Sequence, residues 1–506
     1  MALIKDWNFF WDNREKFKLG HLTTEKPNPK TVGLAEVADA DLSKAVEMIR
    51  AVDIDAINKV KEYGQQINDL KADLIEVMKS GKIYISGCGA TGRLAMFIES
   101  LWKSRAPNNL KEKVIGFMAG GDGALVRSVE GFEDYEEYAI RHIKELGFTA
   151  EDIMLGVTEG GETPFVLSTV EYAREHSKYN PWLIYCNGDD LLANVKRSDD
   201  LIKASDVKNV CIEIGSMALA GSTRMQATSV QTLFVGLALF SIIEDINYAK
   251  ECDALLDALK KIDCNEIAKF TAFESNCYKQ GGYATYLTDS NLGLTVLTDT
   301  TERTPTFSVN PFENINHEKP VPSYCYLSVK DSDKKNVWNQ VLNHEPRTLE
   351  WDFSKSQTGV ENLRGYDISS QVLERRSILP NHQVIEVSSA KNAFVINYAD
   401  TKLEIKYNDM SELSSQVLIK MVMNSHSTLV MARLGRFTSN IMTFVTPGNN
   451  KLIDRATRYV EYLLDQDGIG KPAYDDIARK IHEVSLKMDS TDTIVMKTYK
   501  TIVKGL

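Results

Sequence analysis

A buried strand that runs straight into a helix through a glycine turn is the feature that most limits how this chain can fold. Residues 82–97 read KIYISGCGATGRLAMF, with Gly87, Gly89 and Gly92 at the glycine places of a G-x-G-x-x-G pattern. Such glycines let the backbone approach a ligand, and the next helix offers free N–H groups and its positive dipole end to an anion. The stretch predicts a strand–turn–helix unit with an anion-binding turn.

Short apolar strands and helices continue to alternate along the chain. Strands are predicted at residues 82–87, 113–118, 152–157, 181–186 and 209–214. Helices fall between most of them, which is typical of a parallel sheet covered on both faces. A second, weaker round has predicted strands at 283–288, 323–329, 382–388, 393–399 and 402–407 and a helix at 291–301. From residue 411 the chain is helical again.

A chain of 506 residues exceeds one ordinary core, so two or three domains are expected. The weak second round of strands and helices is the only internal repetition, and it sets the predicted boundaries. These are a lead-in and helix at 1–50, a first α/β domain with the glycine turn at 51–250, a second α/β domain at 251–410, and a helical region at 411–506.

Composition argues against several classes of function. The net charge is −11 and no block of Lys or Arg rises above it, so no nucleic-acid partner is expected. The most apolar window, residues 232–243, is too short to span a bilayer, and early charges argue against a signal peptide. The seven cysteines lack CxxC spacing, which favours free thiols in a reducing compartment. We expect a cytoplasmic protein without membrane contact, metal or cofactor.

The glycine pattern by itself also fits a dinucleotide site. That site needs an acidic residue about 20 positions on, closing the second strand, to hold a ribose. Here the second strand ends in apolar residues, and Asp122 lies late, well beyond Gly92. Thr91 instead adds a hydroxyl where a phosphate oxygen would lie, and Ser86 is a second candidate. A small phosphate is favoured, while a dinucleotide and a connection without any ligand stay open.

A second segment, TEGGETP at residues 158–164, follows a predicted strand and opens the next helix. It holds two glycines and two threonines, the residue types that suit a phosphate loop. Its carboxylates, Glu159 and Glu162, would repel an anion if they pointed inward. The segment therefore favours a phosphate only if these two side chains are otherwise placed.

A third segment, IGSMALAGSTRMQATS at residues 214–229, follows the fifth predicted strand. Ser222 is well placed as a helix N-cap, with Thr223 and Arg224 in the first turn. An arginine there opposes the helix dipole, and an anionic or polyhydroxyl ligand would offset this cost. The alternatives are capping alone for Ser222 and an ordinary surface salt bridge for Arg224.

Together these motifs resemble a known family. GCGATGRLA, MAGGDGALVRSVEGFED and GSTRMQA, at their spacings, resemble the sugar isomerase (SIS) domain. More narrowly, they resemble the branch that holds bacterial N-acetylmuramic acid 6-phosphate etherases and the animal glucokinase regulatory protein. The lead-in TTEKPNPKTVGLAEV and residues 424–456 are similar to that branch as well. The resemblance implies two SIS-type three-layer α/β sandwiches with parallel sheets and a C-terminal helical, lid-like region.

The resemblance also implies ligand contacts where the motifs persist. The implied substrate-binding residues are Gly89, Ala90, Thr91, Gly92, Thr158, Ser222, Arg224 and Lys451. Three positions depart from the branch. Ala90 replaces a residue that is commonly Thr, Glu162 stands where the regulatory protein has Ser, and Gln226 replaces the Lys that follows the arginine.

Two acids would be catalytic if the chain is an enzyme of the etherase type. Glu133, in the GFED segment, matches a sugar-contacting acid of the branch. The second acid position is Leu101 in the first unit but Glu302 in the second, which has lost the phosphate turn. The resemblance therefore implies one composite site, with the phosphate turn from the first unit and Glu302 from the second. The alternative is that Glu302 is a surface acid at a helix end.

Three functions follow from the resemblance. The first is a ligand-responsive protein similar to the glucokinase regulator, which binds a hexose or amino-sugar 6-phosphate, with a sugar kinase as a candidate partner. The second is an etherase-type carbon–oxygen lyase that releases D-lactate from N-acetylmuramic acid 6-phosphate. A phosphosugar isomerase is the lesser alternative, because no His or Lys base stands near the motifs.

Overall fold

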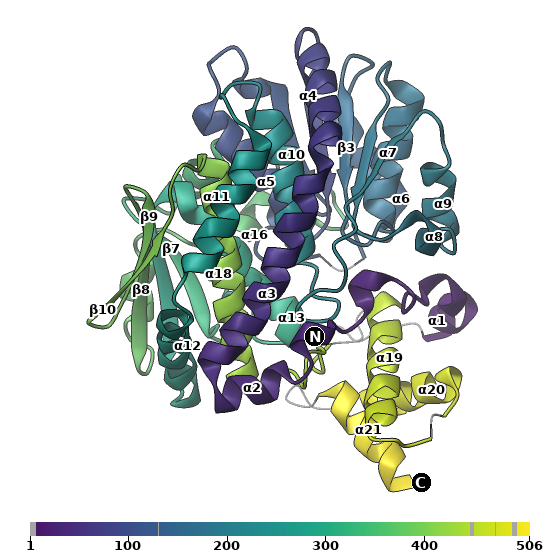
Figure 1. The fold of residues 1–506 in the computed structure, drawn as a ribbon, viewed down its shortest axis with the longest axis vertical. Helices are drawn as coiled ribbons and strands as arrows, with labels where there is room; N and C mark the ends of the chain where they lie inside the picture. Colours follow the sequence, from purple (N-terminus) through teal and green to yellow (C-terminus); the bar gives the residue numbers. More distant parts are fainter. Residues whose placement is uncertain (1–6, 130, 446–449, 471, 488–492, 506) are drawn as a thin grey trace.

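The computed structural model describes residues 7–129, 131–445, 450–470, 472–487 and 493–505 (Figure 1). Its first sheet is parallel throughout, with strand order β2-β1-β3-β4-β5. The strands are β1 Ile83–Gly87, β2 Val114–Met118, β3 Ile153–Val157, β4 Trp182–Tyr185 and β5 Lys208–Cys211. Every residue of β1 and β3 is buried, as expected for strands covered on both faces. We call this sheet and its helices the first unit.

The helices of the first unit precede, connect and follow these strands. They are α2 Leu34–Ala40, α3 Leu42–Val60, α4 Gly64–Met78, α5 Ala90–Arg105, α6 Glu136–Glu145, α7 Pro164–His176, α8 Asp189–Leu192, α9 Lys196–Ile202 and α10 Gln226–Phe240. The short 3-10 helices are η1 Arg14–Phe17, η2 Thr23–Glu25, η3 Pro29–Thr31, η4 Lys61–Tyr63, η5 Lys111–Lys113, η6 Asp122–Ala124 and, later in the chain, η7 Ser290–Leu292. All side chains of α10 are buried, so this helix lies inside the molecule.

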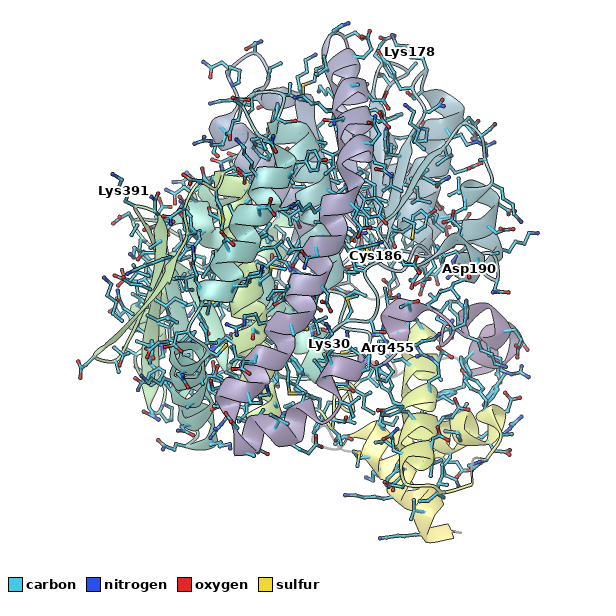
Figure 2. The ribbon with its side chains drawn as sticks, viewed as in Figure 1. Lys30, Lys178, Cys186, Asp190, Lys391 and Arg455 are labelled. Carbon is cyan, nitrogen blue, oxygen red and sulfur yellow. The ribbon has the colours of Figure 1, made fainter. Side chains whose placement is uncertain are left out.

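The second unit is built on a mixed sheet of order β10-β9-β8-β6-β7. Its strands are β6 Tyr283–Thr288, β7 Cys325–Val329, β8 His382–Ala390, β9 Ala393–Tyr398 and β10 Thr401–Lys406. The pairs of β6 with β7 and β8 are parallel, but β8–β9 and β9–β10 are antiparallel. Two-residue turns, one at Lys391 (Figure 2), join these last strands, and a parallel neighbour needs a crossover of a dozen or more residues. The expectation of parallel sheets therefore holds fully for the first unit only.

The two units share one hydrophobic core. Second-unit helices are α11 Tyr248–Lys261, α12 Cys264–Lys279, α13 Gly293–Phe307, α14 Val337–Leu342, α15 Lys355–Thr358, α16 Val360–Gly365 and α17 Val372–Arg376. Helix α18, Glu412–Arg433, is buried from Leu413 to Ala432 and packs against α10, α12 and α13. Helix α13 in turn contacts α5. Central helices thus join the two sheets.

The last helices lie beside the N-terminal helix α1, Trp7–Asn13 (Figure 1), and their buried apolar residues continue the main core. They are α19 Asn450–Gln466, α20 Tyr474–Ser485 and α21 Ile494–Gly505. Phe10 is buried against Ile453 and Ala478, so the two ends of the described chain pack together. Helix α18 therefore belongs to the core, while α19–α21 lie at its edge. No helix in the described ranges is long and apolar enough to cross a membrane.

Buried ion pairs hold α13 in place. Arg303 donates to Glu274 at 2.5 Å and to Asp299 at 3.1 Å, and Arg224 of the first unit donates to Asp299 at 3.2 Å. These side chains are at most 2% exposed. A buried charge that loses its partner is costly, so this cluster ties α13 to α12 and to the first unit.

We expect Arg303→Leu to lower the free energy of unfolding by about 3–5 kcal/mol, because it leaves Glu274 and Asp299 buried without their shared cation. Urea unfolding followed by circular dichroism measures the change. The control is Lys269→Ala, which removes an exposed pair with Glu266 and should cost less than about 1 kcal/mol. Equal effects of the two substitutions would show that the buried cluster does not hold the fold.

Candidate functional site

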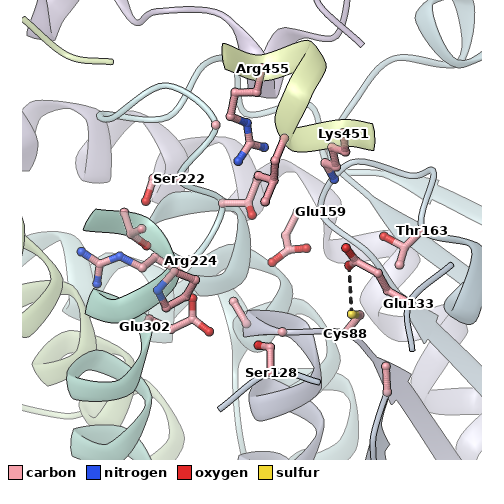
Figure 3. A pocket seen from close by; sticks show the side chains of 18 of the residues that line it. Cys88, Ser128, Glu133, Glu159, Thr163, Ser222, Arg224, Glu302, Lys451 and Arg455 are labelled. Atoms are coloured by element: carbon pink, nitrogen blue, oxygen red, sulfur yellow. Dashed lines mark hydrogen bonds between the residues drawn. The ribbon is translucent and has the colours of Figure 1, made fainter. Parts of the chain in front are cut away.

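A cavity of about 240 Å³ opens at the carboxyl ends of the first-unit strands (Figure 3). Strand β2 lies on one side of β1 in the sheet, and β3 lies on the other side, so the strand order reverses at β1. Such a reversal is called a topological switch point. Ligands of open parallel sheets bind at such a switch point. Three parts of the chain line the cavity: first-unit loops, the end of α13, and residues between 442 and 455.

The glycine turn forms the floor of the cavity at Gly89 and Ala90. Gly89 has a φ of +55°, and no atom lies within 4 Å of where its Cβ would stand. A Cβ on Gly87 would lie 2.3 Å from the backbone of Thr91, and one on Gly92 would lie 2.4 Å from Met118 Cβ. Close helix–strand packing therefore explains the outer glycines, so the match to the dinucleotide pattern needs no dinucleotide.

Two threonines expected at the ligand instead hold loops together. The hydroxyl of Thr91 accepts from the N–H of Cys88 at 3.0 Å and donates to its carbonyl at 2.9 Å. The hydroxyl of Thr158 bonds that of Thr163 at 3.0 Å, and of this pair Thr163 lines the cavity. Thr91, Gly92 and Thr158 lie behind the lining, where they shape the loops that form it.

The two glutamates of the loop after β3 differ in their partners and in their pKa values. Glu162 pairs with Lys451 at 2.6 Å and with Arg197 at 2.5 Å. Burial opposes its ionisation, but these two cations outweigh burial and lower its pKa to about 2. Glu159 lines the cavity, and burial raises its pKa to about 7. Sequence reasoning treated Glu159 only as an obstacle to an anion; the structure makes it part of the site.

Ser222 lines the cavity but is not the predicted N-cap, because α10 begins at Gln226. Residues 222–225 form a separate turn in which the N–H of Met225 donates to the carbonyl of Ser222. The Ser222 side chain is buried, and its hydroxyl has no hydrogen-bond partner among the described residues. A buried hydroxyl without a partner, at the wall of a cavity, is available to a ligand.

Arg224 also borders the cavity, but its guanidinium turns away from it (Figure 3). It donates to Asp299 at 3.2 Å and to the hydroxyl of Thr428 at 2.9 Å. Arg224 is only 2% exposed, so the alternative that it forms an ordinary surface salt bridge is wrong. Its guanidinium pairs with groups on second-unit helices. We therefore expect substitutions of Arg224 to change ligand binding indirectly, by disturbing the packing between the two units.

Acids from both units lie in this one cavity (Figure 3). Glu133 accepts a hydrogen bond from the thiol of Cys88 at 3.3 Å. Glu302 reaches the cavity from α13 and forms a buried ion pair with Arg93 of α5. It is 7% exposed and lies within the helix, so the alternative of a surface acid at a helix end is wrong.

Two cations, Lys451 and Arg455, cover the cavity from the start of α19 and form its roof (Figure 3). Lys451 is held by Glu162, as described above. Arg455 donates to both carboxyl oxygens of Glu25, at 2.6 and 3.0 Å. Burial opposes ionisation of Glu25, but Arg455 and Arg458 hold the pKa of this carboxyl well below its ordinary value. Glu25 belongs to the lead-in TTEKPNP, whose resemblance to the branch is the signal in the sequence that could have marked it as a site residue.

The comparisons with known proteins agree with this architecture. A family model described as "Glucokinase regulatory protein N-terminal SIS domain" matches residues 66–174. N-acetylmuramic acid 6-phosphate etherase of Yersinia pestis (strain Pestoides F) is 32% identical over 221 residues, which are 43% of this chain and 70% of the relative. The chain belongs to the SIS-domain family, in the branch of these two proteins. The etherase of Exiguobacterium sp. is 30% identical, again over 43% of this chain and 70% of the relative.

Two solved structures overlap more of the chain at lower identity. Tagatose-6-phosphate ketose/aldose isomerase from Escherichia coli has 11% identity and a TM-score of 0.44, and covers 81% of this chain and 99% of its own. A putative isomerase of the same kind from Clostridium novyi NT has 13% identity and a TM-score of 0.46, with 79% and 92% covered.

The ion pairs of Glu162 predict a pH dependence of stability. A carboxyl whose pKa is lowered on folding stabilises the protein above its unfolded pKa, and that stability is lost as pH falls through the folded pKa. We expect Glu162→Gln to cost about 3 kcal/mol at pH 7, and this difference from the wild type should shrink between pH 5 and pH 2. Urea unfolding across this range measures it. Glu47→Gln, in an exposed pair with Lys44, is the control and should show little difference at any pH.

Proposed function

We propose that this chain binds a sugar phosphate, either a hexose 6-phosphate or an amino-sugar 6-phosphate, in the cavity between its two SIS-type units. One observation carries the proposal: the glycine turn of the first unit and Glu302 of the second line the same cavity at the switch point of the parallel sheet. Neither unit forms this cavity alone. The family to which the chain belongs supports the class of ligand.

The phosphate group would lie against the start of α5. The first N–H groups of a helix have no partner within the helix, and Gly89 leaves the approach open. Thr163 and Ser222 line the same cavity, and the Ser222 hydroxyl has no hydrogen-bond partner among the described residues. Glu133 and Glu302 would then accept hydrogen bonds from sugar hydroxyls. This arrangement uses neutral donors for the phosphate and carboxylates for the sugar.

A ligand held there would touch three parts of the molecule that are far apart in sequence: the first unit, α13, and α19 with its roof cations. A ligand shifts a conformational equilibrium only by its differential affinity for the two states. Binding would favour the arrangement in which α19 covers the cavity. Such a response, if measured, would support the regulator-like form of the proposal, with a sugar kinase as the candidate partner.

We expect Ser222→Ala to weaken sugar-phosphate binding about 2- to 10-fold, because one neutral hydrogen bond to the ligand is lost. Isothermal titration calorimetry with glucose 6-phosphate, fructose 6-phosphate and glucosamine 6-phosphate measures the affinity. Ser104→Ala, on the outer part of α5, is the matched control and should bind as the wild type does. If none of these sugars, nor N-acetylmuramic acid 6-phosphate, binds at millimolar concentration, the proposal fails.

An etherase-type lyase is the second candidate, because two carboxyl groups from opposite units, Glu133 and Glu302, line one cavity. Such a pair can supply the acid and the base that remove a proton beside the sugar carbonyl and expel the ether substituent at C3. Sequence relatives named as etherases support this candidate.

Incubation with N-acetylmuramic acid 6-phosphate separates the two candidates. The lyase predicts D-lactate release that Glu133→Gln lowers by at least about 100-fold, since general acid–base catalysis contributes that much. A coupled assay with D-lactate dehydrogenase measures the release. Glu137→Gln, which changes an exposed acid on α6, is the control. Binding without lactate release, together with ligand-dependent capture of a sugar kinase, would support the regulator-like protein instead.

A further inference from the structure

Glu159 places a third carboxyl group in the cavity, in the loop that joins β3 to α7. Its side chain points into the cavity together with those of Glu133 and Glu302 (Figure 3). Glu159 is 8% exposed, so bulk water screens it poorly. The loop that carries it also carries Thr163, which the proposed function assigns to the phosphate. An acid therefore stands where a phosphate group would enter.

The other buried acids around the cavity have cations, but Glu159 forms no ion pair within the described residues. Glu162 has Lys451 and Arg197, Glu302 has Arg93, and Glu25 has Arg455. The carboxyl group of Glu159 accepts from its own backbone N–H and lies 3.3 Å from the hydroxyl of Thr228, which also donates to the carbonyl of Thr223 at 2.7 Å. A neutral donor at this distance offsets little of the cost of burying a carboxylate.

Ionisable groups from several elements surround Glu159. They are Cys88 on the glycine turn, Glu133 before α6, Cys186 after β4, Glu302 on α13, Lys420 on α18 and Lys451 on α19. Lys451 is paired with Glu162. Lys420 donates to the carbonyl of Arg224 at 2.8 Å and to Asn424 at 3.0 Å. Neither cation is committed to Glu159, and burial raises the pKa of Glu159 to about 7.

We infer that Glu159 is a specificity-determining residue, which admits a phosphate group to this cavity only together with a proton on its own carboxyl group. The inference rests on the proposed function. An ionised Glu159 beside a phosphate dianion would place two like charges in a poorly screened space. Protonation removes one of them and turns the carboxyl into a hydrogen-bond donor for a phosphate oxygen. The proton comes from solvent, and no covalent bond is made or broken.

Calorimetric titration with glucose 6-phosphate from pH 5.5 to 8.5 tests the inference. Between pH 7.5 and 8.5 the wild type should lose about tenfold in affinity per pH unit, since one proton is taken up with the ligand. Titrations in two buffers of different ionisation enthalpy count that proton directly. We expect Glu159→Gln to bind about 30-fold more tightly than the wild type at pH 8.5, because only about one Glu159 in 30 is protonated there, and to take up no proton. Glu171→Gln, on the surface of α7, is the matched control and should behave as the wild type does.

The phosphate group itself titrates near pH 6, so a second ligand separates its protonation from that of the protein. Glucose 6-sulfate keeps one negative charge throughout this range. Its affinity should fall with rising pH for the wild type and stay level for Glu159→Gln. This comparison assigns the proton to the protein.

Several results would overturn the inference. Equal pH profiles and equal proton uptake for the wild type and Glu159→Gln would refute it, while the proposed function would stand. Weaker binding by Glu159→Gln at every pH would also refute it, because Glu159 would then accept a hydrogen bond from the ligand. If no sugar phosphate binds the wild type at any pH, the proposed function fails and the inference falls with it.

Discussion

The buried ion pairs of α13 are the interaction on which the candidate site depends. Asp299 lies between Arg224 of the first unit and Arg303 of its own helix, and Arg303 continues to Glu274 on α12. Glu302 follows on the same helix and enters the cavity of the first unit. These pairs therefore set the position of Glu302 relative to the glycine turn. An acid from the second half of the chain becomes part of a first-half cavity because its helix is held by charge as well as by packing.

Three cations around the cavity, Arg93, Lys451 and Arg455, already form ion pairs with carboxylates of the protein. The roof cations have Glu162 and Glu25 as partners, and the cation nearest Glu302 is Arg93. An anionic ligand would thus meet helix N–H groups and hydroxyls rather than free positive charge. The protonation state of Glu159 would therefore have a large effect on the binding of an anion. A carboxylate without an ion-pair partner repels a phosphate more strongly here than in a cavity with free cations nearby.

Much of the fold could be predicted from sequence because strand and helix periodicities are local. All five strands of the first unit appear within a few residues of the predicted ranges. The antiparallel edge of the second sheet was missed, although the two-residue turns between its last strands require it. Helix α18 has few charged residues on any face, which is typical of a core helix, whereas α19 carries charges along one face, which is typical of a helix at the surface. No local pattern, however, says that α19 covers a cavity.

The sequence by itself determined the glycine turn, the order of strands and helices, and which residues resemble those of the SIS branch. Glycine spacing and apolar periodicity are properties of neighbouring residues, so they can be read without coordinates. Only the tertiary structure decided where the polar groups point. It places Thr91 and Thr158 behind the lining, pairs Arg224 with Asp299 and directs Glu159 into the cavity. It also leaves the hydroxyl of Ser222 without a hydrogen-bond partner in the part of the chain that the structure describes. Each outcome depends on partners distant in sequence, because a buried polar group must be satisfied by whatever the fold places beside it.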